Sequence, residues 1–251
     1  GLTEHFDVCR AADPGVRGIA VSGGHARIDD AFVERYPELE IVSSFGVGYD
    51  HVDSAYAREH GIVVTNTPDV LTEEVADVAM GLLIATLREF VKADRYLRSG
   101  LWQTQNYPLS AGSLRDRKIG IVGMGRIGQA IARRGALGFG MQLIYHNRSR
   151  LPAVDEAPLK ARYVDKTTLL READHLVLVL PYSPQSHHAV GAAELALMKP
   201  TATLTNIARG GIVDDAALAA ALRERRIAAA GLDVFEGEPS VHPYLLTVPN
   251  V

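Results

Sequence analysis

The chain has 251 residues, 47% of them hydrophobic and 22% charged, which is ordinary for a globular protein of one large or two modest domains. The formal net charge of −4 and the lack of Lys/Arg runs argue against nucleic acid as the main partner. No apolar stretch is long enough to span a membrane, no secretory signal opens the chain, and the single Cys9 excludes an internal disulfide, so we expect a cytoplasmic protein.

Short apolar runs alternate with helical spacing in the first part of the chain. One helix is expected at 52–60, because Gly61 provides a natural end for it. This alternation predicts a small βαβ layer that is incomplete by itself. The expected strands are 18–21, 40–43 and 62–65.

The triplet Asn66-Thr67-Pro68 interrupts this pattern and predicts a hinge. We therefore expect two lobes, one formed by residues 1–67 and the other by residues 68–251. The second lobe opens with a segment that has helical spacing of its apolar residues. Thr72 can cap this helix and two glutamates follow in its first turn, where the helix dipole favours acids.

This long helix is expected to end near Gly100. The segment after it, 101–114, is irregular and contains Trp102 and Tyr107. Two interpretations of this aromatic arm remain open: a loop packed on its own domain, or a contact between two copies of the chain.

Repeated alternation of strands and helices follows to the end of the chain. Such alternation predicts a doubly wound parallel sheet. The expected strands are 118–122, 142–146, 175–180, 203–207 and 228–232. The expected helices are 127–138, 166–173, 192–197 and 214–225. The predicted fold is thus α/β, with a Rossmann-like second lobe and a smaller flavodoxin-like first lobe.

A glycine-rich turn between the first strand and first helix of this sheet has the pattern G-x-G-x-x-G, at Gly123, Gly125 and Gly128. The first glycine allows a tight turn, the second lets a pyrophosphate approach the backbone, and the third lets the helix pack on the strand. Arg126 and Ile127 open the helix, whose free N–H groups attract phosphates. The sequence predicts a dinucleotide site here; the alternative is a tight turn without a ligand.

The end of the next strand indicates which dinucleotide binds. An acidic residue normally stands there and binds the adenosine ribose of NAD. Here the strand runs into Asn147, Arg148, Ser149 and Arg150, without a carboxylate. Guanidinium groups and a hydroxyl suit a 2′-phosphate, so NADP is favoured and NAD stays possible. The alternative is a polar loop whose arginines face solvent.

Four further segments, together with the glycine loop, resemble the D-isomer-specific 2-hydroxyacid dehydrogenases. They cover nearly the whole chain in the expected order. Within that family, the run 94–102 and the Arg148-Ser149 pair are similar to the glyoxylate/hydroxypyruvate and hydroxyphenylpyruvate reductase branch. The four segments are 44–50, 65–73, 205–211 and 231–239.

This resemblance implies roles for individual residues. The backbone N–H groups of Val47 and Gly48 would hold the carboxylate of a small 2-oxo acid. Arg209 would contact both that carboxylate and the carbonyl oxygen. Glu238, which directly precedes a proline as in the family motif, would orient the catalytic histidine, with Glu236 as its rival. Further residues expected at the cofactor are Leu180, Pro181, Ile207 and Asp233.

The family's catalytic histidine follows an Asn-Val pair, and here Asn250-Val251 ends the sequence. His187, His188 and His242 do not match the family's histidine motif, so no catalytic histidine is assigned. We expect it beyond Val251, in a longer protein of which these 251 residues are a part.

The function expected from this resemblance is NADPH-dependent reduction of a small 2-oxo acid to the D-2-hydroxy acid, by a homodimer with no metal site. Two alternatives remain. One is an NAD-dependent phosphoglycerate or D-lactate dehydrogenase. The other is a nucleotide-sensing binding protein like the transcriptional corepressors of the same superfamily.

Overall fold

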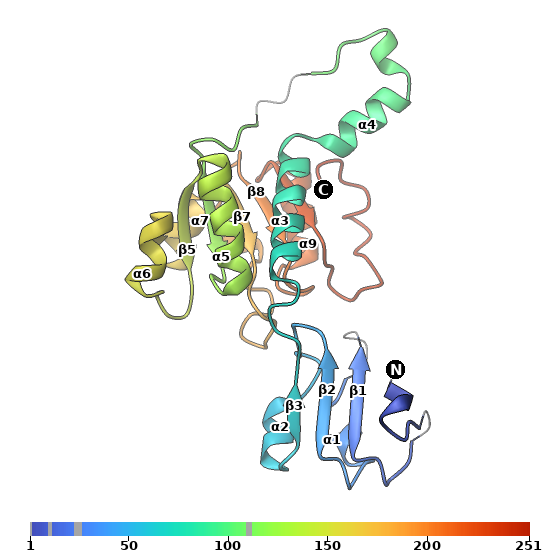
Figure 1. Cartoon of the computed structure of the whole chain (residues 1–251). Coiled ribbons are helices and arrows are strands. Elements are labelled where there is room, and N and C mark those ends of the chain that lie inside the picture. Colours follow the sequence, from blue (N-terminus) through green and yellow to red (C-terminus); the bar gives the residue numbers. More distant parts are fainter. Residues whose placement is uncertain (1, 10–11, 23–26, 109–111) are drawn as a thin grey trace. The chain divides into compact units, whose positions relative to one another are not determined.

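The chain forms two compact units, Gly1–Leu71 and Thr72–Val251, in a computed structural model that describes residues 2–9, 12–22, 27–108 and 112–251. Each unit contains its own parallel β-sheet (Figure 1). Each unit also has its own hydrophobic core, so the packing of each unit depends on its own part of the sequence.

The first unit is a three-stranded parallel sheet with the order β1-β2-β3. Its helices begin where an aspartate accepts backbone N–H bonds: Asp29 caps α1 and Asp53 caps α2. In the described part of this unit, seven buried apolar residues form a core, among them Val42 on the central strand. The elements are a 3-10 turn at Leu2–Glu4, β1 at Gly18–Ser22, α1 at Asp30–Val33, β2 at Ile41–Phe45, α2 at Ser54–Glu59 and β3 at Val63–Thr65.

The second unit contains a six-stranded, wholly parallel sheet with the order β6-β5-β4-β7-β8-β9. Numbered from its own first strand, this order is 3-2-1-4-5-6, which is that of the dinucleotide-binding Rossmann fold. The predicted fold class is therefore confirmed. The strands are β4 at Lys118–Val122, β5 at Gln142–His146, β6 at Arg162–Tyr163, β7 at His175–Leu178, β8 at Thr203–Asn206 and β9 at Ala229–Leu232.

Helices cover both faces of this sheet, as the βα alternation predicts. The helices of this unit are α3 at Thr72–Leu87, α4 at Phe90–Arg98, α5 at Arg126–Arg133, α6 at Ala153–Glu156, α7 at Lys166–Glu172, α8 at Ala192–Leu195 and α9 at Asp215–Arg223. A π-helical turn, Arg134–Gly138, extends α5, and 3-10 turns lie at Leu101–Gln103 and Ala157–Leu159.

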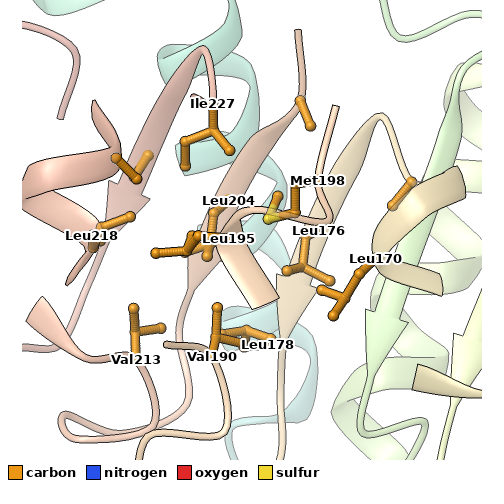
Figure 2. Packing of buried hydrophobic residues seen from close by; sticks show 14 of the residues in the cluster. Leu170, Leu176, Leu178, Val190, Leu195, Met198, Leu204, Val213, Leu218 and Ile227 are labelled. Carbon is orange, nitrogen blue, oxygen red and sulfur yellow. The ribbon is translucent and has the colours of Figure 1, made fainter. Parts of the chain in front are cut away.

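The two faces of the sheet belong to two separate cores. Along β7, Leu176 and Leu178 pack with α7, α8 and α9, whereas Val177 packs on the opposite side with α3 and α5. This division follows from the two-residue period of a strand. Figure 2 shows the first of these cores, where Leu204 of β8 lies among side chains from the strands and the helices around it.

One prediction for this unit is wrong: the long helix expected from Thr72 to near Gly100 is broken. Helix α3 ends at Leu87, and α4 starts at Phe90 after Glu89, whose backbone is left-handed at φ 52°. The carboxylate of Glu89 binds Lys92 at 3.0 Å and Tyr107 at 3.2 Å. Helix α3 packs on the sheet, whereas α4 buries none of its residues. The two halves of the expected helix therefore lie in different environments.

Three short elements of the described chain were missed from the sequence, namely helix α1, strand β6 and helix α6. Strand β6 is two residues long, lies at the sheet edge and is partly exposed, so it carries no apolar run that periodicity could detect.

Candidate functional site

The glycine-rich turn follows β4, the strand beside which the order of the sheet reverses. Gly123 has a φ of 101°, and a Cβ atom on it would stand 2.5 Å from the carbonyl oxygen of Val179. A Cβ atom on Gly128 would overlap the carbonyl oxygen of Gly123. These two glycines are therefore required by the packing of the strand against β7 and against its own helix.

Gly125 differs from the other two, because a Cβ atom on it would meet no protein atom within 4 Å. Nothing in the described chain requires a glycine there, whereas a phosphate approaching the backbone would. Gly125 is also the extended N-cap of α5, and no side chain caps that helix. The first N–H groups of the helix, from Arg126 and Ile127 on, have no intrahelical acceptor and can bind an anion.

Asn147 connects the end of β5 to this turn. Its side-chain oxygen accepts the N–H of Met124 at 2.6 Å, and its backbone carbonyl accepts the hydroxyl of Tyr163 at 3.1 Å. The N–H of Gly123 donates to the carbonyl of His146 at 3.1 Å. Asn147 thus shapes the turn through a structural contact that the sequence does not predict.

Arg150 is committed to a buried carboxylate. Its guanidinium donates to both oxygens of Glu156, at 2.9 Å and 2.7 Å, and Glu156 is 5% exposed. The hydroxyl of Tyr145 donates to the same carboxylate and accepts the N–H of Leu151 at 2.8 Å. The hydrogen bonds from Arg150 and Tyr145 lower the pKa of Glu156 to about 2, whereas burial and Glu156 raise the pKa of Tyr145 to about 12.

This network leaves Arg148 as the available guanidinium at the end of β5. Arg148 and Ser149 are exposed, and within the described ranges no side chain pairs with Arg148. The sequence offers the guanidinium groups of Arg148 and Arg150 for a 2′-phosphate, and Arg148 is the one expected to contact it. Arg150 holds the loop in place through Glu156, whereas the guanidinium group of Arg148 is exposed to solvent.

The remaining expected cofactor residues follow the other strands at the same edge of the sheet. Leu180 and Pro181 lie in the loop after β7, where the buried hydroxyl of Ser186 donates to the carbonyl of Pro181 at 3.0 Å. Ile207 follows β8 and is 7% exposed, packed in the core under α3 and α5. Asp233 follows β9 and has an exposed side chain. In a parallel sheet, all of these positions lie at one edge.

Arg209 lies in a tight turn after β8 that Asn206 organises. The side chain of Asn206 accepts the N–H of Ala208 at 3.1 Å and donates to the carbonyl of Arg209 at 3.1 Å. The Arg209 side chain is half-buried and donates to the carbonyl of Ala208 at 2.7 Å. A Cβ atom on Gly210 would overlap the carbonyl oxygen of Phe235, so this glycine lets the turn contact the loop after β9.

The two candidate acids of that loop have different surroundings. Both oxygens of Glu236 contact Nε2 of His188, at 3.0 Å and 2.9 Å, and its N–H donates to the buried Asp215 at 3.1 Å. Glu238 is exposed, and its carboxylate accepts only the N–H of Phe235, at 3.3 Å, among the described groups. Glu236 is therefore engaged, and Glu238 is available to pair with another group.

The first unit carries a second candidate contact, in the loop after β2. The carbonyl of Gly46 accepts the N–H of Thr67 at 3.0 Å, and the carbonyl of Val47 accepts the side chain of Asn66 at 2.8 Å. The N–H groups of Val47 and Gly48 meet no acceptor in the described part of the chain. The loop is therefore fixed through its carbonyls, while these two donors stay open to an anion.

Comparison with known proteins identifies the family of this chain. The profile described as D-isomer specific 2-hydroxyacid dehydrogenase, NAD binding domain, matches residues 80–251. A glyoxylate reductase of Thermococcus onnurineus is 49% identical over 90% of this chain and 68% of its own length. A glyoxylate/hydroxypyruvate reductase B of Klebsiella pneumoniae is 40% identical over 100% of this chain and 81% of its own.

A solved structure is similar over the whole chain. It is that of an NADPH-dependent glyoxylate/hydroxypyruvate reductase of Sinorhizobium meliloti in complex with NADP and malonate. It is 44% identical, has a TM-score of 0.90, and is matched over 100% of this chain and 79% of that one. The chain belongs to the family of D-isomer specific 2-hydroxyacid dehydrogenases, and it is an NAD(P)-dependent enzyme. Among the described residues, no helix has the length and apolarity to cross a membrane.

We expect the stability contributed by Glu156 to depend on pH. Its pKa in the folded chain, about 2, lies below the ordinary value of 4.5, so the carboxylate stabilises the fold above about pH 5, and this contribution disappears as the pH falls toward 2. Urea denaturation should show that Glu156→Gln loses stability relative to wild type by a constant amount at neutral pH and by less in acid. The exposed neighbour substitution Asp155→Asn is the control; a pH-independent difference for Glu156→Gln would contradict this prediction.

Proposed function

We propose that this chain catalyses the NADPH-dependent reduction of a small 2-oxo acid, of the glyoxylate or hydroxypyruvate type, to the D-2-hydroxy acid. The observation that carries the choice of NADP is the end of β5, where Arg148 stands exposed and no carboxylate is present. The Sinorhizobium enzyme, which uses NADPH and was solved with NADP, supports it. The names of the Thermococcus and Klebsiella relatives support the substrate class.

The cofactor site that we propose lies along the carboxyl edge of the six-stranded sheet. The backbone of the glycine turn and the start of α5 would hold the pyrophosphate, and Asn147, Arg148 and Ser149 would surround the 2′-phosphate. Bound NADPH supplies the hydride. The nicotinamide end would be held by Leu180, Pro181, Ile207 and Asp233.

Arg209 is the residue that we assign to the substrate carbonyl. Its planar fork can contact the carboxylate and the carbonyl oxygen together, and its positive charge stabilises the alkoxide that forms during reduction. The N–H groups of Val47 and Gly48 would bind the carboxylate. Glu238 would orient the histidine that donates the proton to this alkoxide. Within the described ranges, no histidine forms a hydrogen bond with Glu238.

We also propose that two copies associate through α4 and the aromatic arm after it. Helix α4 buries none of its residues, and Phe90, Val91, Leu97 and Trp102 are each more than half exposed. Tyr96 holds the arm on the helix by donating to the carbonyl of Gln105 at 2.9 Å. An apolar surface of this kind needs a partner, and in a homodimer the partner is the same surface of the other copy.

We place the enzyme in the cytoplasm. Its one cysteine, Cys9, cannot form a disulfide within the 251 residues, and this composition is typical of proteins from a reducing compartment.

The direct test of the function is a panel of 2-oxo acids assayed on the full-length protein with NADPH and NADH side by side. We expect glyoxylate and hydroxypyruvate to be reduced, with a higher kcat/KM for NADPH. Preference for NADH, with pyruvate or a phosphorylated hydroxypyruvate as substrate, would favour the NAD-dependent dehydrogenases instead.

Arg148→Ala should weaken the binding of NADPH and leave the binding of NADH nearly unchanged, because only NADPH carries the 2′-phosphate. The loss of a hydrogen bond to a charged group is worth about 1.5–3 kcal/mol, so the KM for NADPH should rise roughly 10- to 150-fold. Arg171→Ala, which removes an exposed arginine of α7, is the matched control. Equal effects of Arg148→Ala on both cofactors would remove Arg148 from the 2′-phosphate site.

Arg209→Lys keeps the positive charge and removes the planar fork, so kcat/KM for the 2-oxo acid should fall by at least about tenfold. The Kd of NADPH, measured by fluorescence titration, should stay close to that of wild type, because the proposed contact is with the substrate. Arg171→Lys serves as the control. Wild-type kcat/KM in Arg209→Lys would exclude this role.

Trp102→Ala should weaken the proposed dimer, since buried tryptophans dominate interface energetics and their truncation typically costs about 2 kcal/mol or more. Analytical ultracentrifugation of the full-length protein should then give a dissociation constant at least roughly tenfold higher than that of wild type. Val154→Ala, at an exposed valine of α6, should leave it unchanged. A wild-type monomer at micromolar concentration would refute the dimer.

A further inference from the structure

Two adjacent histidines meet an acidic residue from a distant loop at the carboxyl edge of the large sheet. His187 and His188 lie in the loop after β7, and Glu236 lies in the loop after β9. One ring nitrogen of each histidine and one carboxylate oxygen of Glu236 lie within 4.8 Å of one another. The two rings are stacked, with their centroids 3.9 Å apart. Only the fold brings these residues together.

Backbone contacts fix the groups in this cluster. The N–H of His188 donates to the carbonyl of Gly211 at 2.7 Å, and its backbone is left-handed at φ 49°. The N–H of Glu236 donates to the buried carboxylate of Asp215 at 3.1 Å. A Cβ atom on Gly211 would lie 3.4 Å from Nδ1 of His187 and 3.8 Å from Oε1 of Glu236, so both side chains stand over that glycine.

Each imidazole has an oxygen-bearing group on its Nδ1 side. The hydroxyl of Tyr182 is 3.1 Å from Nδ1 of His187, and a carboxylate oxygen of Asp214 is 3.8 Å from Nδ1 of His188. Histidines that bind metals usually have such a partner at the second nitrogen, because it fixes the ring orientation and the tautomer. Nε2 of His188 faces both oxygens of Glu236, and Nε2 of His187 has no hydrogen-bond partner in the described part of the chain.

We propose that His187, His188 and Glu236 form a binding site for a divalent transition-metal ion, with Zn²⁺ as the best match. Two imidazoles and a carboxylate are a ligand set that Zn²⁺ accepts, with further positions left for water. Ligand atoms around a tetrahedral Zn²⁺ stand roughly 3.3 Å apart, given bonds of about 2.0–2.1 Å. In the present arrangement the three ligand atoms lie within 4.8 Å of one another, so the side chains must rotate to close around the ion.

Binding at His188 requires a local shift of a proton. The ion takes the place of the proton between Nε2 of His188 and Glu236, and the ring then carries its proton at Nδ1, on the side of Asp214. The His188 and Glu236 side chains are 36% and 38% exposed, so an ion can reach them from solvent. A bound ion would join the loops after β7 and β9 over Gly211, two residues beyond Arg209.

The test uses the tag-free full-length protein, treated with a chelator and titrated with Co²⁺ while its visible absorption is recorded, and with Zn²⁺ by calorimetry. We expect one ion per chain and the absorption bands of Co²⁺ with nitrogen ligands. His187→Ala and Glu236→Gln should each raise the Kd at least about tenfold. His60→Ala, at an exposed histidine of the first unit, should leave the Kd unchanged.

A second readout separates a metal site from a hydrogen-bonded pair that only supports the fold. Saturating Zn²⁺ should raise the Tm of wild type and of His60→Ala but not that of His187→Ala, since ligands stabilise the state that binds them. Circular dichroism checks that each variant is folded. No bound ion in wild type, or an affinity that neither His187→Ala nor Glu236→Gln reduces, would overturn the proposal. None of these readouts depends on the reductase activity, so the two proposals fail separately.

Discussion

The close approach of β4 to its neighbours at Gly123 is the constraint on which the candidate cofactor site depends. A Cβ atom at this position would stand 2.5 Å from a carbonyl of the chain segment after β7, and the next turn leaves no space for one at Gly128. Because these two glycines let strand, turn and helix pack tightly, the N-terminus of α5 follows the end of β4 by a short turn, with the open Gly125 as its N-cap. An anion site results from backbone geometry, before any charged side chain contributes.

The end of β5 is built around that turn by polar contacts. Asn147 holds the turn through the N–H of Met124, and Tyr145, Glu156 and Arg150 hold the loop that follows. Burying the Glu156 carboxylate is tolerated because a guanidinium and a phenol both donate to it. Arg150 therefore has a structural role in this loop, whereas Arg148 is exposed. The proposed selectivity for NADP depends on these different roles: Arg150 binds Glu156, and Arg148 is proposed to bind the 2′-phosphate.

The loops after β8 and β9 approach each other closely at Gly210 and Gly211. Gly210 lets the turn that carries Arg209 contact the carbonyl of Phe235, and His188 reaches both the turn and Glu236. Arg209 and Glu238 therefore lie on segments that support each other, although 29 positions separate them in the sequence. The same closeness produces the histidine and glutamate cluster for which we propose a metal ion.

The sequence by itself determined the parallel sheet of the second unit, its dinucleotide turn and its family, because buried strands, glycine spacing and strand-end residues leave local patterns. It also identified the missing carboxylate after β5. Tertiary structure alone decided the break at Glu89, since α3 packs on the sheet and α4 does not. Only the tertiary structure shows that Arg150 pairs with Glu156 and that His187, His188 and Glu236 lie together. Contacts between residues far apart in the chain leave no periodicity in a sequence, and neither does the choice between two arginines of one loop.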